Sequence, residues 1–500
     1  MANSVDPQDD SDKSATENES RSEPSALKGC DVVSVAKVPW VQGAGTAGEP
    51  PVAELDSMLF DGDLDQVPFA DVDLNSTEFV EQVIPSADRS NSRSTSQKSS
   101  GNTLESRPPA SPHRTGPPPI RSRQLVLIGA GATHLQILRW WQLNPIRRVN
   151  LTLVSAFDHV VHPGMLPGTL AGLYRPEETR IDLMKFCQQC GVRLIVDRAN
   201  SLDPNTREIE FAHQPMLRFD LASINIGSVP SAEPLWQSHR MMISTKPSST
   251  FLDRFRARFQ ELVDQWNRAP GPEMLQVAVV GAGVNGVELA FSLEQCRFDL
   301  ELPIDVRVID GNSEILPSFS RATVRRVKRL FKKRGIETSL GSRVVDVDDS
   351  GPSTLVLENG QMIRADLVVW ATDAAPPMSL AGFRLSKSAQ GFLKTRPTFQ
   401  SIDEVPVFIV GDVADFAGQT ISNAETSAVR RASALHENLV RWFDDQPLAE
   451  YRPKKSAMTI LGCGDQTAIL SYHGFCFYGG WVWWLKDTID RRWIRQFQVS

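Results

Sequence analysis

The feature that most constrains the fold is a glycine-rich turn that occurs twice in this chain of 500 residues. The first glycine turn reads Leu-Val-Leu-Ile-Gly-Ala-Gly-Ala-Thr-His over residues 125–134. The second reads Val-Ala-Val-Val-Gly-Ala-Gly-Val-Asn-Gly over residues 277–286. In each copy four apolar residues predict a short buried strand, and a helical pattern follows the glycines. Each copy therefore predicts a strand–turn–helix unit of the kind that holds a dinucleotide pyrophosphate at a helix N-terminus.

The two copies differ at their third glycine position. The second copy has the complete G-x-G-x-x-G pattern, with Gly281, Gly283 and Gly286. In the first copy Gly129 and Gly131 are followed by His134 instead of a third glycine. A single incomplete pattern is weak evidence, but the intact second copy strengthens it. Two such turns in one chain predict two dinucleotides held together, which is an arrangement suited to redox chemistry.

Composition excludes several classes of protein. The formal net charge of -7 argues against general nucleic-acid binding, which favours basic domains. Six cysteines in a chain of this length are too few for a disulfide scaffold and indicate a reducing compartment. We find neither a secretory signal pattern nor a run of about 18 apolar residues. We therefore expect a cytoplasmic protein, or one attached to the inner face of the cell membrane.

The distribution of apolar residues predicts the domain organisation. Residues 1–120 are rich in Ser, Asp, Glu and Pro, which predicts a disordered tail and linker. Within the tail, residues 52–84 mix apolar and acidic side chains; this is either plain disorder or a segment that folds on a partner. We expect an α/β fold with two Rossmann-like domains. The first domain covers 121–273 and 365–450, the second covers 274–364, and a C-terminal region covers 451–500.

The strand after each glycine turn is expected to end at the adenosine ribose, where an acid is usual. The first domain has Ser155 at this place, and a hydroxyl can also bind a ribose. The second domain has Asp310, which lies 29 residues beyond Gly281 (310 − 281), against the usual roughly 20. The acid favours NAD over NADP, whereas Arg307 is a counter-signal unless it faces away from the nucleotide.

Four further positions lie where other segments reach the cofactor sites. The loop 162–168 is either a surface turn or an apolar wall beside a flavin, and its Met165 favours the wall. Gly227 ends a strand within 219–230, and Thr372 follows the strand by which the chain leaves the second domain. Asp412 follows the buried strand 405–410 and is placed to accept a hydrogen bond from a ribityl hydroxyl.

Several helices are predicted by apolar spacing. They cover residues 135–143, 181–191, 251–266, 319–334 and 422–442. The basic run in 319–334 is interpreted as a solvated face. Cys187 and Cys190 have the spacing of a redox motif, but their place late in a helix favours two buried thiols over a catalytic disulfide.

The C-terminal segment 481–497 is predicted to be an amphipathic helix. Its apolar side contains Trp481, Trp484, Leu485, Ile489, Trp493 and Phe497, and its polar side contains Lys486, Asp487, Asp490, Arg491 and Arg495. Aromatic and basic content suits a membrane interface. Packing on the protein itself or across a homodimer is an equally weighted alternative.

These motifs together resemble the pyridine nucleotide–disulfide oxidoreductases. The absence of a cysteine pair at either usual place makes the chain similar to type II NADH dehydrogenases. Other features look like the flavoprotein module joined to selenophosphate synthetase: His134, the Gly-Met-Leu-Pro-Gly of 164–168, Gly464-Asp465, and the segment 483–492. Two positions depart from the relatives: Ala132 replaces a second histidine, and Asp373 replaces a glycine.

The resemblance implies FAD in the first domain, NADH in the second, and an electron acceptor such as a quinone. For FAD it implies Gly129, Gly131, His134, Ser155, Met165, Gly227, Gly411 and Asp412. For NADH it implies Gly281, Gly283, Gly286, Asp310 and Thr372, with Glu288 orienting the nicotinamide or flavin. The alternatives are a soluble flavoprotein with another acceptor, and a non-catalytic flavin-binding protein whose tail recruits partners.

Overall fold

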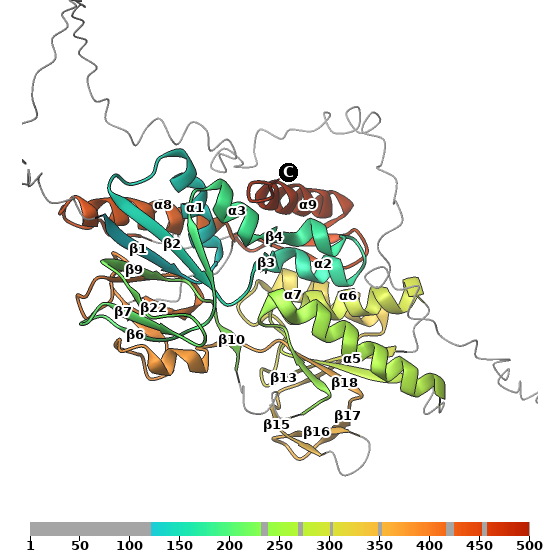
Figure 1. The fold of residues 1–500 in the computed structure, drawn as a ribbon. Helices are drawn as coiled ribbons and strands as arrows, with labels where there is room; N and C mark the ends of the chain where they lie inside the picture. Colours follow the sequence, from blue (N-terminus) through green and yellow to red (C-terminus); the bar gives the residue numbers. More distant parts are fainter. Residues whose placement is uncertain are drawn as a thin grey trace, which may run out of the picture. The chain divides into compact units, whose positions relative to one another are not determined.

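The computed structural model describes residues 122–231, 239–268, 274–300, 304–348, 353–416, 425–452 and 458–499 (Figure 1). The predicted tail and linker of 1–120 lie outside these residues, as does the beginning of the helix predicted over 422–442. Among the described residues, no helix combines the length and apolarity needed to cross a bilayer.

The first glycine turn belongs to a five-stranded parallel sheet with the order β21-β9-β1-β2-β5. The strands are β1 (Arg123–Ile128), β2 (Val149–Ser155), β5 (Arg193–Val196), β9 (Leu221–Ile224) and β21 (Val407–Ile409). Alternate side chains of β1 enter two separate cores, Leu125 and Leu127 on one face and Val126 and Ile128 on the other. Such burial on both faces explains why residues 125–128 of this strand are all apolar.

The second glycine turn belongs to a second parallel sheet with the order β11-β18-β12-β13-β14. Its strands are β11 (Met242–Ser244), β12 (Leu275–Val280), β13 (Ile304–Asp310), β14 (Glu337–Leu340) and β18 (Leu367–Trp370). Strands β11 and β18 lie outside the range 274–364 expected for the second domain. The chain therefore enters the second sheet before residue 273 and leaves it after residue 364.

Helices cover both sheets, and α1 packs beside α8 in the first domain (Figure 1). The helices are α1 (Ala132–Leu143), α2 (Leu166–Leu170), α3 (Leu183–Gln189), α5 (Ser248–Arg268), α6 (Val284–Leu300), α7 (Arg321–Arg334), α8 (Glu425–Phe443) and α9 (Gly480–Arg495). Short 3-10 turns are η5 (Pro163–Met165), η6 (Pro176–Thr179), η7 (Met378–Gly382) and η8 (Gly411–Val413).

Small sheets surround the two parallel ones. Three are antiparallel triplets: β6 (Ala199–Asp203), β7 (Glu208–Phe211) and β8 (Leu217–Arg218); β15 (Val344–Asp348), β16 (Thr354–Leu357) and β17 (Met362–Arg364); β23 (Thr459–Gly462), β24 (Ala468–Tyr472) and β25 (Phe475–Gly479). Three are pairs: β3 (His159–Val161) with β4 (Arg180–Asp182), β10 (Val229–Pro230) with β19 (Ala374–Ala375), and β20 (Leu393–Thr395) with β22 (Ala414–Phe416).

Helix boundaries differ from the predicted ones where a local cap decides them. The helix expected over 181–191 begins at Leu183, because Asp182 accepts a hydrogen bond from the Lys185 N–H at 3.0 Å and ends strand β4. The basic helix α7 begins after the Ser320 cap and ends at Gly335, whose φ is +76°.

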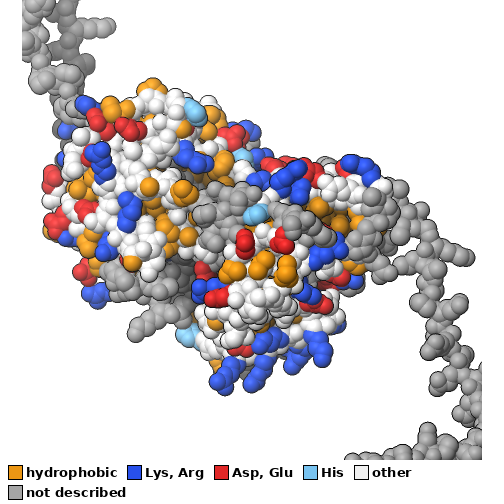
Figure 2. Space-filling model, turned by 90° about the horizontal axis from the view of Figure 1, so that it is seen from below, with side chains coloured by type: hydrophobic (Ala, Val, Ile, Leu, Met, Phe, Trp, Pro, Cys, Tyr) orange, Lys and Arg blue, Asp and Glu red, His pale blue; other side chains and the backbone are white. Residues whose placement is uncertain are grey.

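The face of the molecule shown in Figure 2 carries both acidic and basic side chains. This mixed charge differs from the continuous basic stripe that is typical of a nucleic-acid-binding surface.

The polar side predicted for the C-terminal helix is wrong at two residues. Lys486 and Asp490 are only 7% and 4% exposed, and their charges pair at 2.6 Å beneath helix α9. Lys486 also donates to the Gly164 carbonyl at 2.7 Å. Helical periodicity cannot anticipate this, because the loop that accepts the lysine lies more than 300 residues away in the sequence.

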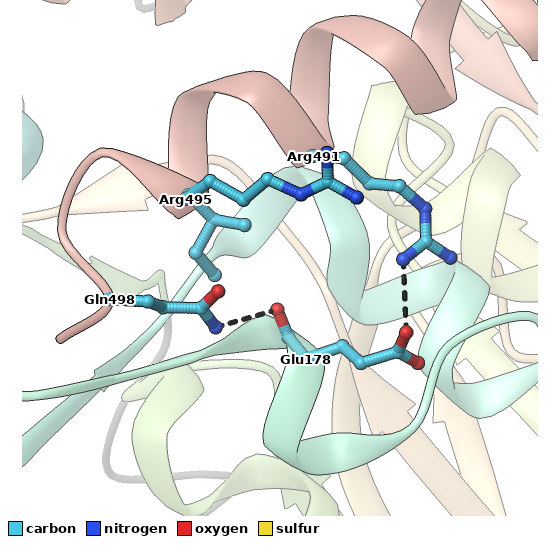
Figure 3. Close-up of a pocket in the computed structure, with 5 residues that line it drawn as sticks. Glu178, Arg491, Arg495 and Gln498 are labelled. Atoms are coloured by element: carbon cyan, nitrogen blue, oxygen red, sulfur yellow. Dashed lines mark hydrogen bonds and ion pairs between the residues drawn. The ribbon is translucent and has the colours of Figure 1, made fainter. Parts of the chain in front are cut away.

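The two halves of α9 have different surroundings. In its second half the helix is fixed to the first domain by Arg491, which pairs with Glu178 at 3.0 Å (Figure 3), and Phe497, which follows the helix, packs on Phe186. At its beginning, Trp481 and Trp484 are exposed by 49% and 62%. The predicted apolar stripe is therefore partly core and partly surface.

Candidate cofactor sites

The first glycine turn closes on the end of a neighbouring strand. Gly129 has φ = +93°, and a Cβ there would lie 2.3 Å from the Asn225 carbonyl oxygen. Gly131 caps helix α1. Strands β1, β9 and β21 are parallel, so Gly129, Gly227 and Gly411, which follow them, meet at one edge of the sheet. This carboxyl edge is where open α/β sheets bind ligands.

His134 connects the helix to the strands beneath it. Its ring is completely buried, with Nδ1 2.7 Å from the Gly129 carbonyl and Nε2 2.8 Å from the Ser223 hydroxyl. A neutral ring protonated on Nδ1 donates to the carbonyl and accepts from the hydroxyl. Burial lowers the pKa of His134 to about 4, which favours this neutral form. Both ring nitrogens are therefore engaged by the protein itself.

The Asn225 side chain lies between two glycines of the first site. A Cβ on Gly131 would come within 2.5 Å of its amide, and a Cβ on Gly411 would lie 2.2 Å from its Oδ1. Asn225 is only 5% exposed, and its Nδ2 has no hydrogen-bond partner in the described protein. Gly131 and Gly411 are thus required for this amide to fit.

Asp412 is held by two residues that the sequence did not single out. Its Oδ2 accepts from the Ser228 hydroxyl at 3.0 Å and from the Lys246 ammonium at 2.9 Å. Burial raises the pKa of Asp412, but the Lys246 charge and these hydrogen bonds outweigh burial and hold the pKa below its usual value. Lys246 follows β11 of the second sheet, so this ion pair joins the two sheets.

The other residues expected at the flavin have structural surroundings of their own. Ser155 is buried, and its hydroxyl accepts from the Phe157 N–H at 3.3 Å. Met165 is completely buried in the first core, so the loop 162–168 is not a fully exposed turn. Gly227 has φ = +78° with open space beside its Cα.

In the second glycine turn the backbone packs closely because the glycines have no side chains. A Cβ on Gly281 would lie 2.4 Å from the Ala371 carbonyl oxygen, and a Cβ on Gly286 would lie 1.8 Å from the Gly281 carbonyl oxygen. These two glycines are therefore needed for contact between helix and strands. Gly283 has open space around it, as expected where a ligand backbone approaches the turn.

Asp310 closes the second turn from the end of β13. Its Oδ2 accepts from the Ala282 N–H at 2.6 Å, and its Oδ1 accepts from the Asn312 N–H at 2.7 Å. Arg307 faces elsewhere, because it pairs with Glu337 on the neighbouring strand β14. Thr372 accepts a hydrogen bond from the Ser231 hydroxyl at 2.9 Å.

Glu288 lies where α6 meets the C-terminal region. It is buried, and its Oε1 accepts from the Gly462 N–H at 2.7 Å. A Cβ on Gly462 would lie 3.5 Å from this oxygen and 3.7 Å from the Cε atom of Lys486. Glu288 and Lys486 therefore border the same glycine, although they come from the second domain and from α9.

The two cysteines with redox-motif spacing are buried free thiols. Burial raises the pKa of Cys187 to about 12 and that of Cys190 to about 11. Protonated thiols are poor nucleophiles, which agrees with the interpretation of buried helix cysteines.

Comparison with known proteins agrees with this architecture. Residues 123–428 match the family described as pyridine nucleotide-disulphide oxidoreductase, and the chain belongs to this family. It is therefore an oxidoreductase with FAD and NADH as its cofactors. The particular proteins it is similar to include the NADH dehydrogenase-like protein YutJ of Bacillus subtilis, 25% identical over 68% of this chain and 89% of that protein. A type II NADH:quinone oxidoreductase of Staphylococcus saprophyticus is 21% identical over 74% of this chain and 94% of that protein.

Solved structures share the fold. The sulfide:quinone oxidoreductase of Aquifex aeolicus aligns with a TM-score of 0.61 and 17% identity, over 75% of this chain and 91% of that chain. The NDH2 of Plasmodium falciparum in complex with NADH aligns with a TM-score of 0.60 and 13% identity, over 75% of this chain and 98% of that chain.

The residues present fit the two cofactors. The first site combines a helix N-terminus, a glycine cradle and the orphaned Asn225 amide, which suit a pyrophosphate. The second site has an open Gly283 and an acid at the end of the second strand. Sequence reasoning missed Asn225, Ser228 and Lys246; the one available signal was a polar residue, Asn225, just before the Gly227 turn.

Proposed function

We propose that this protein passes electrons from NADH through FAD to a quinone. The observation that carries the proposal is the pair of glycine cradles, each at the carboxyl edge of a parallel sheet, joined by the Lys246–Asp412 ion pair. When bound, FAD accepts a hydride from the nicotinamide and passes two electrons to the acceptor. The names of the quinone-reducing relatives support the choice of acceptor.

Each cofactor is assigned to residues of one sheet. Gly129, Gly131 and Asp412 would hold FAD in the first domain, and Gly281, Gly283 and Asp310 would hold NADH in the second. Glu288 would orient the ring systems from the border of the C-terminal region. Hydride transfer requires positioning rather than a general acid or base, and hydrogen bonds hold Asp412, Asp310 and Glu288 in fixed positions.

A cluster of exposed aromatic side chains supports contact with a membrane surface. We define the aromatic patch as Phe475, Phe477, Trp481 and Trp484, with exposures of 66%, 45%, 49% and 62%. Phe477 contacts both Phe475 and Trp481 through its ring. Aromatic rings at a protein surface suit the interface of a bilayer. A long-chain quinone is dissolved in the bilayer itself, so contact with the bilayer would bring the protein close to this acceptor. Attachment to the inner face of the cell membrane would follow from this contact.

The test replaces the aromatic patch without truncating the chain, because truncation before α9 would also remove the core residue Phe497, which follows this helix. The variant carries Phe475→Ser, Phe477→Ser, Trp481→Ser and Trp484→Ser. We expect it to reduce a water-soluble short-chain quinone like the wild type, and to lose both sedimentation with phospholipid vesicles and reduction of a long-chain quinone within them. A matched control replaces two remote exposed residues, Met216→Ser and Met362→Ser.

Three results would contradict the proposal in different ways. Absence of quinone reduction by the wild type, with reduction of another acceptor, would favour the soluble flavoprotein. Unchanged vesicle binding by the variant would remove the membrane role of the patch. A change from dimer to monomer in sedimentation velocity would assign the patch to a homodimer interface.

A further inference from the structure

The strongest unassigned feature is the Asn225 amide in the first site. It directly follows strand β9 at the carboxyl edge, beside the first glycine turn, and its backbone N–H donates to the Ile128 carbonyl at 2.7 Å. Its side chain is wedged between the backbones of Gly131 and Gly411. The protein therefore fixes the position of the amide through three separate segments.

The Asn225 side chain has a hydrogen-bond donor that no acceptor of the described protein satisfies. Nδ2 is buried and has no acceptor in the described protein. A buried donor without a partner costs roughly 1–3 kcal/mol, so native proteins satisfy nearly all such groups. The neighbouring helix N-terminus at Gly131 is an anion-binding element, because its first N–H groups point away from the helix.

We infer that Asn225 is an FAD-binding residue whose Nδ2 donates a hydrogen bond to a pyrophosphate oxygen of the cofactor. The amide supplies a neutral donor beside the N-terminus of α1, and the phosphate oxygen supplies the acceptor that the protein lacks. The first turn would therefore gain a side-chain donor from the strand next to β1, in addition to the backbone N–H groups at the start of α1. Gly131 and Gly411 are then glycines for two reasons, close approach to the cofactor and room for this amide.

The test measures release of FAD from the full-length holoprotein by the rise in flavin fluorescence, without NADH or a quinone. Asn225→Asp keeps the shape of the side chain but replaces the donor with a carboxylate facing the phosphates. We expect release about 100-fold faster than from the wild type at pH 8, and about tenfold faster for Asn225→Ala. At pH 5 the ratio for Asn225→Asp should fall, because a protonated carboxyl group again donates.

A matched control is Asn205→Asp, which adds the same charge in an exposed turn. Equal release rates for the wild type, Asn225→Asp and Asn225→Ala would overturn the inference and leave Asn225 as a spacer. If Asn225→Asp fails to fold, Asn225→Ala decides alone, because it removes the donor without adding charge. Failure of the quinone proposal would leave this measurement unaffected, since release of FAD involves no acceptor.

Discussion

The two glycine turns place a helix against a parallel strand by opposite means. In the second turn Gly286 has no side chain, and the Gly281 carbonyl occupies the space that a Cβ would need. In the first turn the equivalent residue, His134, bridges the Gly129 carbonyl and the Ser223 hydroxyl with its ring. The comparison teaches that the third position of the pattern is a packing position, which either an absent or a fully bonded side chain can satisfy.

The largest effect is expected in the second turn. Gly286→Ala would place a Cβ 1.8 Å from a backbone oxygen, so helix α6 must move. We expect a loss of roughly 3 kcal/mol or more of unfolding free energy and loss of NADH binding. Urea unfolding and anaerobic NADH titration measure the two. Gly283→Ala is the control for stability, because nothing lies within 4 Å of an added Cβ at that residue. If Gly283→Ala lost as much unfolding free energy as Gly286→Ala, the packing role of the third glycine would be contradicted.

Replacing His134 by glycine makes the first turn resemble the second. The change removes two buried hydrogen bonds and leaves a cavity, so we expect a loss on the order of 3 kcal/mol of unfolding free energy. Release of FAD from the folded variant should stay close to the wild-type rate, because both ring nitrogens contact protein. Urea unfolding and flavin fluorescence measure these quantities. Rapid release of FAD with unchanged stability would instead make His134 a cofactor ligand.

The histidine bridge also predicts a pH dependence. The folded pKa of His134, about 4, lies below the unfolded value of 6.5, so the unfolded chain binds more protons between these values. The contribution of His134 to stability is complete above pH 6.5 and is lost as the pH falls towards 4. We expect the difference in unfolding free energy between the wild type and His134→Gly to narrow by about 2 kcal/mol at pH 5. A constant difference across this range would show that the ring binds protons equally in the folded and unfolded states, and hence that its folded pKa is not lowered.

A smaller effect is expected where the two sheets are joined. Lys246→Met removes the charge that compensates Asp412, and we expect FAD release about tenfold faster and slower reduction of the flavin by NADH. Lys246→Arg should recover most of the loss, because it restores a charged donor. Flavin fluorescence and stopped-flow absorbance measure the two rates. Wild-type behaviour of Lys246→Met would mean that the ion pair is not needed at either site.

The smallest effect is expected for the buried thiols. Cys187→Ser and Cys190→Ser should change steady-state NADH oxidation by less than about twofold, because protonated buried thiols take no part in electron transfer. Loss of turnover in a correctly folded variant would place a dithiol relay between the two turns.

The sequence predicted what depends on local pattern. Four apolar residues followed by glycines were sufficient for both strand–turn–helix units, and apolar spacing was sufficient for the helix α5. It could not predict partners that are distant in the chain. Lys246 reaches Asp412 across 166 residues, and Lys486 reaches the Gly164 carbonyl across 322, so neither contact leaves a periodic signal. For the same reason the sequence did not predict that Lys486 and Asp490, two residues of the expected polar side of the C-terminal helix, are buried.

The most direct test of the two-turn arrangement is an anaerobic titration of the FAD-loaded, full-length protein with NADH. The account predicts that one equivalent of NADH bleaches the visible absorption band of the bound flavin, and that Gly286→Ala, if it retains FAD, is not bleached. Persistence of the flavin band in the wild type at excess NADH would contradict the account and would favour a flavin-binding protein without catalysis.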